Sequence, residues 1–385
     1  MKSTKTQSRG DQYVNRRQVL MADLATTHRI DAVVITHAVD IRYLSGATEG
    51  VSALLIGPGL STLFTSKMFE ARVPVEAPGC HVIVGAKVFE ESARQLRECR
   101  YRRGVGYQGS KLVQSRFQQM SAAMGSRKLV DIGEAVVQLR TLKDAGELRL
   151  IRQCVKIAET AFLELIGQGA GYLMTRTERQ VAAELEYRMC MIGADRQAFP
   201  FNGIIAAAGP HSASCHHFPG ARKPRPGEPL LIDWGAEKDG YRCDITRVLF
   251  MGEPDPRMRG IFEVVSAANV AGIHAIRTGA LCSEVSDAGW NVVREAGYGE
   301  LIRHGLGHGF GLEIHEAPGL GSGGSQEAAH KAARLAANMV VTVEPGIYLE
   351  GKGGVRLEDD VLVTGTGHKV LTSLSTSLES AILRT

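Results

Sequence analysis

The chain has 385 residues, of which 44% are hydrophobic and 22% are charged. At roughly 150 residues per domain this predicts two or three globular domains, and it excludes a disordered chain, a coiled coil and a disulfide-stapled small protein. The 45 basic and 41 acidic residues leave a net charge of +4, which is too weak to indicate nucleic-acid binding.

The seven cysteines are scattered and form no Cys-x-x-Cys pair, which favours reduced thiols over a disulfide framework or a thiolate zinc site. Residues 1–12 are polar and basic, without the apolar segment of a secretory signal. No run approaches the roughly 18 apolar residues of a membrane span. We therefore expect a cytoplasmic protein that has neither a membrane nor a nucleic acid as its partner.

Residues 14–140 alternate helical and strand patterns. A helix is expected over residues 15–28, and short buried strands are expected over residues 31–36, 52–59, 81–85 and 102–107. This alternation predicts an α/β domain without a catalytic cluster. We assign it residues 14–143, with the boundary to a second domain near residues 142–146.

The second domain, residues 144–385, repeats one order of elements. A helix over 147–166 and a helix opened by Thr175 and Glu178 in capping-box spacing precede strand-like runs at 201–209, 229–236 and 241–250. Asp255-Pro256 and Ser283 begin two more helices, and these precede strand-like runs at 311–316, 338–346 and 354–363. The repeat predicts two halves related by a pseudo-twofold axis. The fold class expected for the whole chain is α/β, or more broadly α+β.

Two aspartates interrupt strand-like runs that are otherwise apolar, Asp233 in LLIDWGA and Asp244 in YRCDITRVLF. If a two-residue hairpin loop joins these runs, Asp233 pairs either with Asp244 (loop 238–239) or with Thr246 (loop 239–240). In both registers the three side chains share one face, because side chains alternate with a period of two. Two carboxylates that face each other repel, and a cation between them removes the repulsion.

Acidic and imidazole side chains gather again in the second half. Glu344 ends the run MVVTVE, and Arg356 and Glu358 project from one face of GVRLEDDVLV. Three histidines fall in HGLGHGFGLEIHE, where glycines allow the backbone to approach a ligand closely: His304, His308 and His315. His304 either contacts that ligand or supports a residue that does.

Carboxylates with one imidazole predict a site for two divalent metal ions. Four carboxylates balance the charge of two such ions, as in hydrolases that activate a bridging water. Oxygen-rich ligands favour Mn²⁺, Co²⁺, Fe²⁺ or Zn²⁺ over ions that select thiolates. The alternative is a pair of solvated strand aspartates without a metal.

These motifs resemble those of the pita-bread metallopeptidases, the superfamily of methionine aminopeptidase, aminopeptidase P, prolidase and creatinase. The resemblance lies in LLIDWGAEKDGYRCDITR, HGLGHGFGLEIHE, VTVEPGIY and GGVRLEDDVLVT, and it extends from residue 147 to the C-terminus. The preceding region is similar to the creatinase-type N-terminal domain of prolidases and aminopeptidases P. The resemblance implies a pita-bread domain with five metal ligands: Asp233, Asp244, His308, Glu344 and Glu358.

The resemblance also implies roles for residues around the ligands. His216 corresponds to a histidine that faces the substrate, with His211 and His217 as competitors because AAAGPHSASCHHF departs from the family pattern. His315 corresponds to a histidine that contacts the scissile carbonyl. Arg356 corresponds to an arginine that helps to hold the proline carboxylate in prolidases.

We therefore expect hydrolysis of Xaa-Pro dipeptides by a hydroxide that bridges two metal ions, with Mn²⁺ as the first candidate. Glu344, His315 and His216 would be the catalytic residues, with Glu344 carrying the proton, and the resemblance implies a homodimer. Aminopeptidase P, a non-peptide amidohydrolase of the creatinase or ectoine-hydrolase type and a non-catalytic peptide-binding module are the alternatives. Creatinases lack the metal ligands and binding modules typically lose them, whereas all five are present here.

Overall fold

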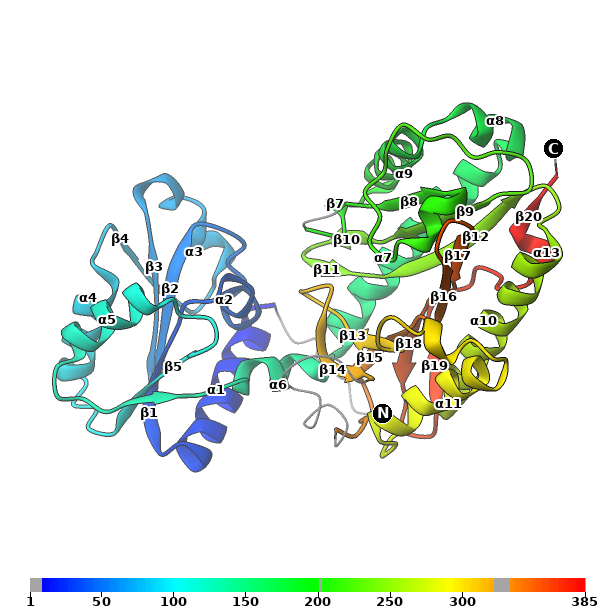
Figure 1. The fold of residues 1–385 in the computed structure, drawn as a ribbon. Coiled ribbons are helices and arrows are strands. Elements are labelled where there is room, and N and C mark those ends of the chain that lie inside the picture. The colour runs from blue at the N-terminus through cyan, green and yellow to red at the C-terminus, as the bar shows by residue number, and fades with distance from the viewer. Residues whose placement is uncertain (1–8, 201–202, 322–332, 385) are drawn as a thin grey trace, which may run out of the picture. The chain divides into compact units, whose positions relative to one another are not determined.

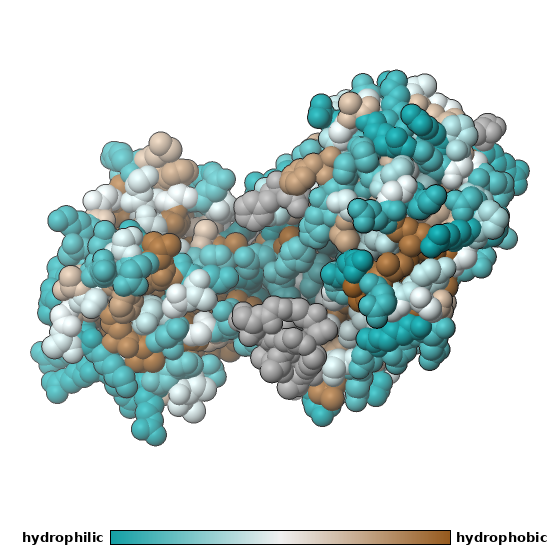
Figure 2. Space-filling view, in the orientation of Figure 1, coloured by the Kyte–Doolittle hydropathy of each residue, from teal (hydrophilic) through white to brown (hydrophobic). Residues whose placement is uncertain are grey.

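The computed structural model describes residues 9–200, 203–321 and 333–384. The chain forms two compact units, Met1–Arg140 and Thr141–Thr385, which divide close to the expected boundary. On the face drawn in Figure 2, hydrophilic residues cover most of both units. Within the described ranges, no helix has the length and apolar character needed to cross a membrane.

The N-terminal unit is built on one mixed sheet with the strand order β4-β3-β2-β1-β5-β6 (Figure 1). Its strands are β1 (Ile30–Ile35), β2 (Val51–Gly57), β3 (Leu60–Thr65), β4 (His81–Val84), β5 (Gly104–Tyr107) and β6 (Leu129–Asp131). Its helices are α1 (Arg9–Thr27), α2 (Ala38–Ser45), α3 (Val73–Glu76), α4 (Val88–Glu98), α5 (Gln114–Met124) and α6 (Ala135–Thr141). The four expected strands correspond to β1, β2, β4 and β5. Sequence patterns miss β3, which is rich in hydroxyl residues, and β6, which has only three residues.

A buried ion pair joins two helices of this unit. Arg140 on α6 donates from Nη1 to Asp40 Oδ1 on α2 at 2.7 Å, and Gln108 donates from Nε2 to Asp40 Oδ2 at 2.6 Å. Asp40 is 0% exposed and Arg140 is 2% exposed. The pair therefore has little water around it, and each charge depends on its protein partners.

Arg140→Ala should destabilise the N-terminal unit by about 3–5 kcal/mol, because it leaves the buried charge of Asp40 without its cation. Denaturant unfolding measures the loss. The matched control is Arg94→Ala, since Arg94 pairs with Glu91 on an exposed helix surface. Equal unfolding transitions for the two variants would contradict the importance of the buried pair.

Two larger sheets dominate the C-terminal unit, with the orders β20-β12-β9-β8 and β14-β13-β15-β18-β19. The first contains β8 (Ile205–Ala208), β9 (Pro229–Trp234), β12 (Ile245–Met251) and β20 (Ile382–Leu383). The second contains β13 (Gly307–Gly309), β14 (Glu316–Leu320), β15 (Val340–Val343), β18 (Asp359–Val363) and β19 (His368–Val370). Smaller sheets contain β7 (Arg196–Gln197), β10 (Ala236–Lys238), β11 (Tyr241–Arg242), β16 (Gly346–Leu349) and β17 (Gly353–Arg356). The helices are α7 (Ala145–Ile166), α8 (Gly169–Thr175), α9 (Glu178–Ile192), α10 (Pro256–Ala275), α11 (Cys282–Glu295) and α13 (Leu378–Ala381).

In each half of this unit helices precede strands, as the repeated order predicts, but the first half has three helices (α7, α8 and α9) where two were expected, and the second half has α10 and α11. Strand β9 is buried on both faces: Trp234 packs with α7 and α9, whereas Leu231 packs with the core of the second half. Asp233 follows Leu231 on that second face, because side chains alternate along a strand. An isolated bridge between Thr246 and Glu358 joins the two halves. Asp233 therefore lies on the face where the halves meet.

The hairpin that carries Asp233 has the second of the two expected registers. Asp233 lies opposite Thr246, and the loop consists of Asp239 and Gly240. Both loop residues have a positive φ, 48° and 82°, as in the type I′ turn that Asp-Gly favours. This confirms that Asp233 and Thr246 share one face.

The predicted cap of helix α9 is wrong. Thr177 and Gln180 form the capping box, and Thr175 ends helix α8 instead. The carboxylate of Glu178 is unavailable to a cap because it binds the loop that follows β8. The cap predicted for α10 is confirmed, since Asp255 accepts from the backbone N–H groups of the first turn.

Two predicted strands also need correction. Residues 311–315 form bends rather than a strand, and the backbone N–H of Gly311 donates to the carbonyl of Glu313. The run 354–363 is divided into β17 and β18 at Leu357 and Glu358. The division allows Glu358 to leave the ladder and bridge to Thr246 in the other half.

Candidate metal centre

The five residues expected to bind metal converge where the two halves of the C-terminal unit meet. Asp233 comes from β9 and Asp244 directly precedes β12. His308 comes from β13, Glu344 directly follows β15, and Glu358 lies between β17 and β18. All five are buried or half-buried.

The nitrogen of His308 that faces this centre lies close to two carboxylates. His308 Nε2 is 3.6 Å from Asp244 Oδ2 and 3.4 Å from Glu344 Oε1. Asp244, His308 and Glu358 each offer an atom within 4.8 Å of the others. The other ring nitrogen of His308, Nδ1, lies 3.1 Å from the Gly309 carbonyl, to which it donates. Nε2 therefore has a lone pair that points towards the carboxylates. Because the imidazole nitrogen and the carboxylate oxygens are all acceptors, a cation between them would stabilise the arrangement.

The carboxylates also present oxygen atoms that lack protein donors. Asp233 Oδ1, Asp244 Oδ1 and Glu358 Oε1 are buried and have no hydrogen-bond partner among the residues that the structure describes. Buried carboxylate oxygens are normally paired, because leaving them unpaired costs free energy. These atoms are thus suited to bind divalent ions, and the donor set of oxygens with one imidazole fits such ions.

Burial and mutual repulsion perturb the titration of the centre. Burial, followed by the charges of Glu358 and Asp233, raises the pKa of Asp244 well above its usual value. Burial raises the pKa of Glu344 to about 8. Burial and the neighbouring His315 lower the pKa of His308 to about 3, which keeps the imidazole neutral, as a metal ligand must be.

Arg356 is buried beside the candidate ligands, and its guanidinium contacts four protein acceptors. Nη2 donates to Asp233 Oδ2 at 2.6 Å, and Nε donates to Thr246 Oγ1 at 3.1 Å. Nη1 donates to Tyr348 Oη at 2.8 Å and to the Cys215 carbonyl at 3.3 Å. These bonds occupy four of the five guanidinium donors and orient Asp233. The expected contact of Arg356 with a substrate carboxylate remains a prediction.

His315 and His304 lie near the candidate ligand His308, and His216 lies near those two histidines. The rings of His315 and His308 are 4.3 Å apart between centroids. His216 is exposed, and it interacts electrostatically with His304 and His315. Its competitors His211 and His217 are hydrogen-bonded to Glu178 instead. The arrangement favours His216 as the substrate-facing residue of the three.

His304 supports the centre through a tyrosine. Its Nε2 lies 2.8 Å from Tyr348 Oη, which accepts from Arg356 and so donates to the ring. Its Nδ1 donates to the Gly305 carbonyl at 2.8 Å. Burial and the charge of Arg356 lower the pKa of His304 to about 4, so the ring is neutral.

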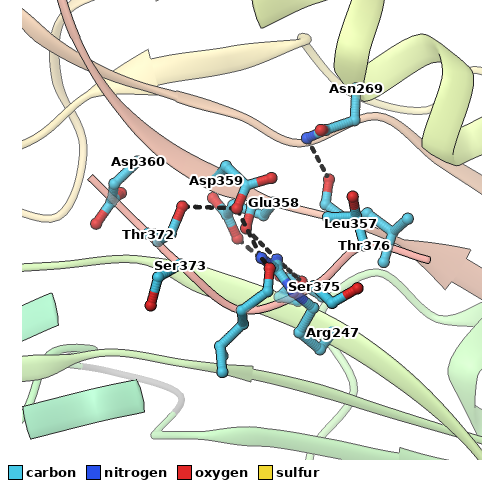
Figure 3. Close-up of polar contacts among 12 residues, drawn as sticks. Arg247, Asn269, Leu357, Glu358, Asp359, Asp360, Thr372, Ser373, Ser375 and Thr376 are labelled. Atoms are coloured by element: carbon cyan, nitrogen blue, oxygen red, sulfur yellow. Dashed lines mark hydrogen bonds and ion pairs between the residues drawn. The ribbon is translucent and has the colours of Figure 1, made fainter. Parts of the chain in front are cut away.

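A polar network that the sequence analysis missed fixes the backbone around Glu358 (Figure 3). Arg247 donates from Nη1 to the Glu358 carbonyl and from Nη2 to Asp359 Oδ1, each at 2.6 Å. Thr372 donates to the same Asp359 oxygen at 2.6 Å. The sequence does contain a sign of this network. Arg247 and Asp359 are charged residues within apolar strand runs, which is the same pattern that identified the expected ligands.

Two family models and several solved structures match most of this chain. The family model described as "Metallopeptidase family M24" matches residues 149–365, and that of the "Creatinase/Prolidase N-terminal domain" matches residues 16–142. An Xaa-Pro dipeptidase of Pyrococcus furiosus is 31% identical over 91% of this chain and 95% of that protein. The solved Xaa-Pro dipeptidase of Bacillus anthracis is 30% identical, with a TM-score of 0.87 over 96% of this chain and all of that one. The solved X-Pro aminopeptidase of Thermotoga maritima is 31% identical, with a TM-score of 0.82 over the same shares.

Proposed function

The chain belongs to metallopeptidase family M24, and from this membership we propose that it cleaves Xaa-Pro dipeptides with the help of two divalent metal ions. The observation that carries the proposal is the convergence of buried carboxylates on His308, three of which each have an oxygen with no hydrogen-bond donor in the described part of the chain. Four carboxylates and two divalent ions balance in charge. We propose Mn²⁺ as the first ion to test, with Co²⁺, Zn²⁺ and Fe²⁺ as alternatives.

The chain's own residues would bind the peptide and move the proton. Divalent ions at this centre supply positive charge that lowers the pKa of a water molecule and stabilises charge on the scissile carbonyl. Glu344 Oε1 lies 3.4 Å from His308 Nε2 at this centre, so we assign its carboxylate to accept a proton and to release it to the leaving nitrogen. We assign His315 as a hydrogen-bond donor to the carbonyl oxygen, and His216 as a contact on the substrate side.

A second candidate function, that of aminopeptidase P, is favoured by the contacts of Arg356. A dipeptidase needs a cation for the free carboxylate of proline, and Arg356 is the residue expected to supply it. Four of its five donors are already bound to protein acceptors. In a longer peptide the proline carbonyl is uncharged, so no such cation is needed.

The comparison of Ala-Pro with Ala-Pro-Ala tests the proposed substrate. Manganese-loaded protein should have a higher kcat/KM for Ala-Pro if it is a dipeptidase. A preference for Ala-Pro-Ala would assign the activity of aminopeptidase P. Cleavage of neither peptide would reject both and favour a non-peptide amide as the substrate.

Arg356→Ala should lower kcat/KM for both peptides by a similar factor, roughly 10²–10³-fold, because it leaves the buried Asp233 carboxylate without its cation. Steady-state kinetics with the two peptides measure the effect. Arg188→Ala, which removes a half-buried guanidinium paired with Glu184 on helix α9, is the control. A loss of roughly 10–150-fold confined to Ala-Pro would instead assign the carboxylate-binding role to Arg356.

A further inference from the structure

The carboxylate of Glu178, the first residue of α9, is fully buried and accepts four hydrogen bonds. Oε1 accepts from the backbone N–H of Ala208 at 2.8 Å and from His211 Nδ1 at 2.7 Å. Oε2 accepts from the backbone N–H of Gly220 at 2.9 Å and from His217 Nε2 at 2.9 Å. Burial alone would raise the pKa of Glu178, but these donors lower it, so the carboxylate is charged.

All four donors belong to one segment, residues 208–220, which we call the histidine loop. The loop begins at the end of β8 and includes the 3₁₀ helix η2 (Gly209–Ala213). Two backbone bonds add to the attachment, from Glu178 N to the Arg222 carbonyl at 2.8 Å and from Arg179 N to the Gly220 carbonyl at 3.1 Å. One buried side chain thus holds both ends and two internal points of the histidine loop.

His216 lies in this loop between two anchored residues. The Cys215 carbonyl accepts from Arg356, and the His217 ring donates to Glu178. The position of the His216 backbone is therefore fixed from the metal centre on one side and from Glu178 on the other. Its side chain is left exposed beside His304 and His315.

We propose that Glu178 is a positioning residue that fixes the histidine loop and thereby sets His216 at the substrate side of the metal centre. The inference rests on the proposed function, in which His216 contacts the substrate. Glu178, His211 and His217 could also be considered as ligands of a further metal ion. Each oxygen of Glu178 already accepts two hydrogen bonds, so the geometry is that of a hydrogen-bonded anchor.

A double-mutant cycle between Glu178 and His216 tests the proposal. Glu178→Gln should lower kcat/KM roughly 10–100-fold, because a displacement of about 1 Å in a catalytic group has an effect of that order. In the His216→Ala background the same substitution should change kcat/KM by less than about threefold, since the residue through which Glu178 acts is absent. Losses that multiply in the double variant would overturn the proposal.

Two controls separate positioning from general damage. Glu184→Gln makes the same change on the same helix, at a carboxylate bonded to Tyr172 and Arg188, and should leave kcat/KM unchanged. Metal content should be two ions per chain in every variant. A loss of metal in Glu178→Gln, or a third ion that is lost in His211→Ala, would overturn the proposal. If Glu178→Gln does not fold, His217→Gln removes the anchor next to His216 and enters the same cycle.

A readout without turnover keeps the inference separate from the proposed function. In protein with ¹³C-labelled histidine, the ring resonance of His216 is identified by its loss in His216→Ala. Glu178→Gln should shift it, whereas Glu184→Gln should not. An unshifted resonance would overturn the positioning role even if the wild-type protein cleaved no proline peptide, a result that would reject only the proposed function.

Discussion

Glu344→Gln should lower kcat for the preferred proline peptide by at least about 10³-fold. Glutamine keeps the shape of the side chain but cannot carry a negative charge or exchange a proton at this position. The Glu344 carboxylate lies 3.4 Å from His308 Nε2 and has two assigned roles, as a candidate metal ligand and as the group that transfers the proton. The substitution removes both. Steady-state kinetics of manganese-loaded protein measure the effect.

Glu350→Gln is the matched control for this variant. Glu350 lies six positions further along the chain, in the exposed turn between β16 and β17. It should keep the wild-type kcat, and both variants should keep the wild-type fold by circular dichroism. A kcat for Glu344→Gln within about tenfold of the wild type would contradict the proton-transfer role.

Removal of metal should abolish peptide cleavage, and addition of Mn²⁺ or Co²⁺ should restore it. The reason is that carboxylates and a neutral imidazole cannot stabilise negative charge on the carbonyl oxygen, and the one cation described beside them, Arg356, is already bound to Asp233. Dialysis against EDTA, followed by metal analysis and the Ala-Pro assay, measures both steps. Activity that persists in metal-free protein would contradict the metal-dependent mechanism.

The same treatment should make stability depend on pH in a predictable direction. Burial raises the pKa of Glu344 from 4.5 to about 8, so between these values the metal-free native state binds more protons than the unfolded state. His308 and His304, whose pKa values burial lowers, act in the opposite direction only below their usual pKa of 6.5. From about pH 6.5 to pH 8 the stability of the metal-free protein should therefore fall as pH rises. Bound ions replace those protons, so the difference in Tm between loaded and metal-free protein should widen from pH 5 to pH 8. A difference that stays constant with pH would contradict this linkage.

The convergence of the candidate ligands could be predicted because their signal is local. A charged side chain within an apolar strand run is unusual, and period-two alternation assigns it to a face without any knowledge of the tertiary fold. The Asp239-Gly240 turn then decided between two registers that the sequence left open, since both residues adopt the positive φ that this turn requires. Asp233 and Thr246 share a face in either register.

The role of Glu178 could not be predicted, because two capping boxes overlap in the sequence. Thr175 with Glu178 and Thr177 with Gln180 both have the required spacing. Which of the two boxes forms depends on the distant histidine loop. The carboxylate of Glu178 binds that loop, so Gln180 instead of Glu178 caps the helix. Three of the four partners of Arg356 could not be predicted for the same reason, because Asp233, Thr246 and Cys215 are more than 100 positions away in sequence.

The meeting of the two halves at Thr246 and Glu358 has a consequence for cooperativity. The first half supplies two of the candidate ligands, Asp233 and Asp244, and the second half supplies the other three. Without ions, the halves meet across carboxyl groups that either repel one another or bind protons. With ions bound, the same seam becomes a non-covalent cross-link between segments that lie far apart in the chain. Metal occupancy would then decide whether the two halves of the C-terminal unit unfold as one body or one after the other.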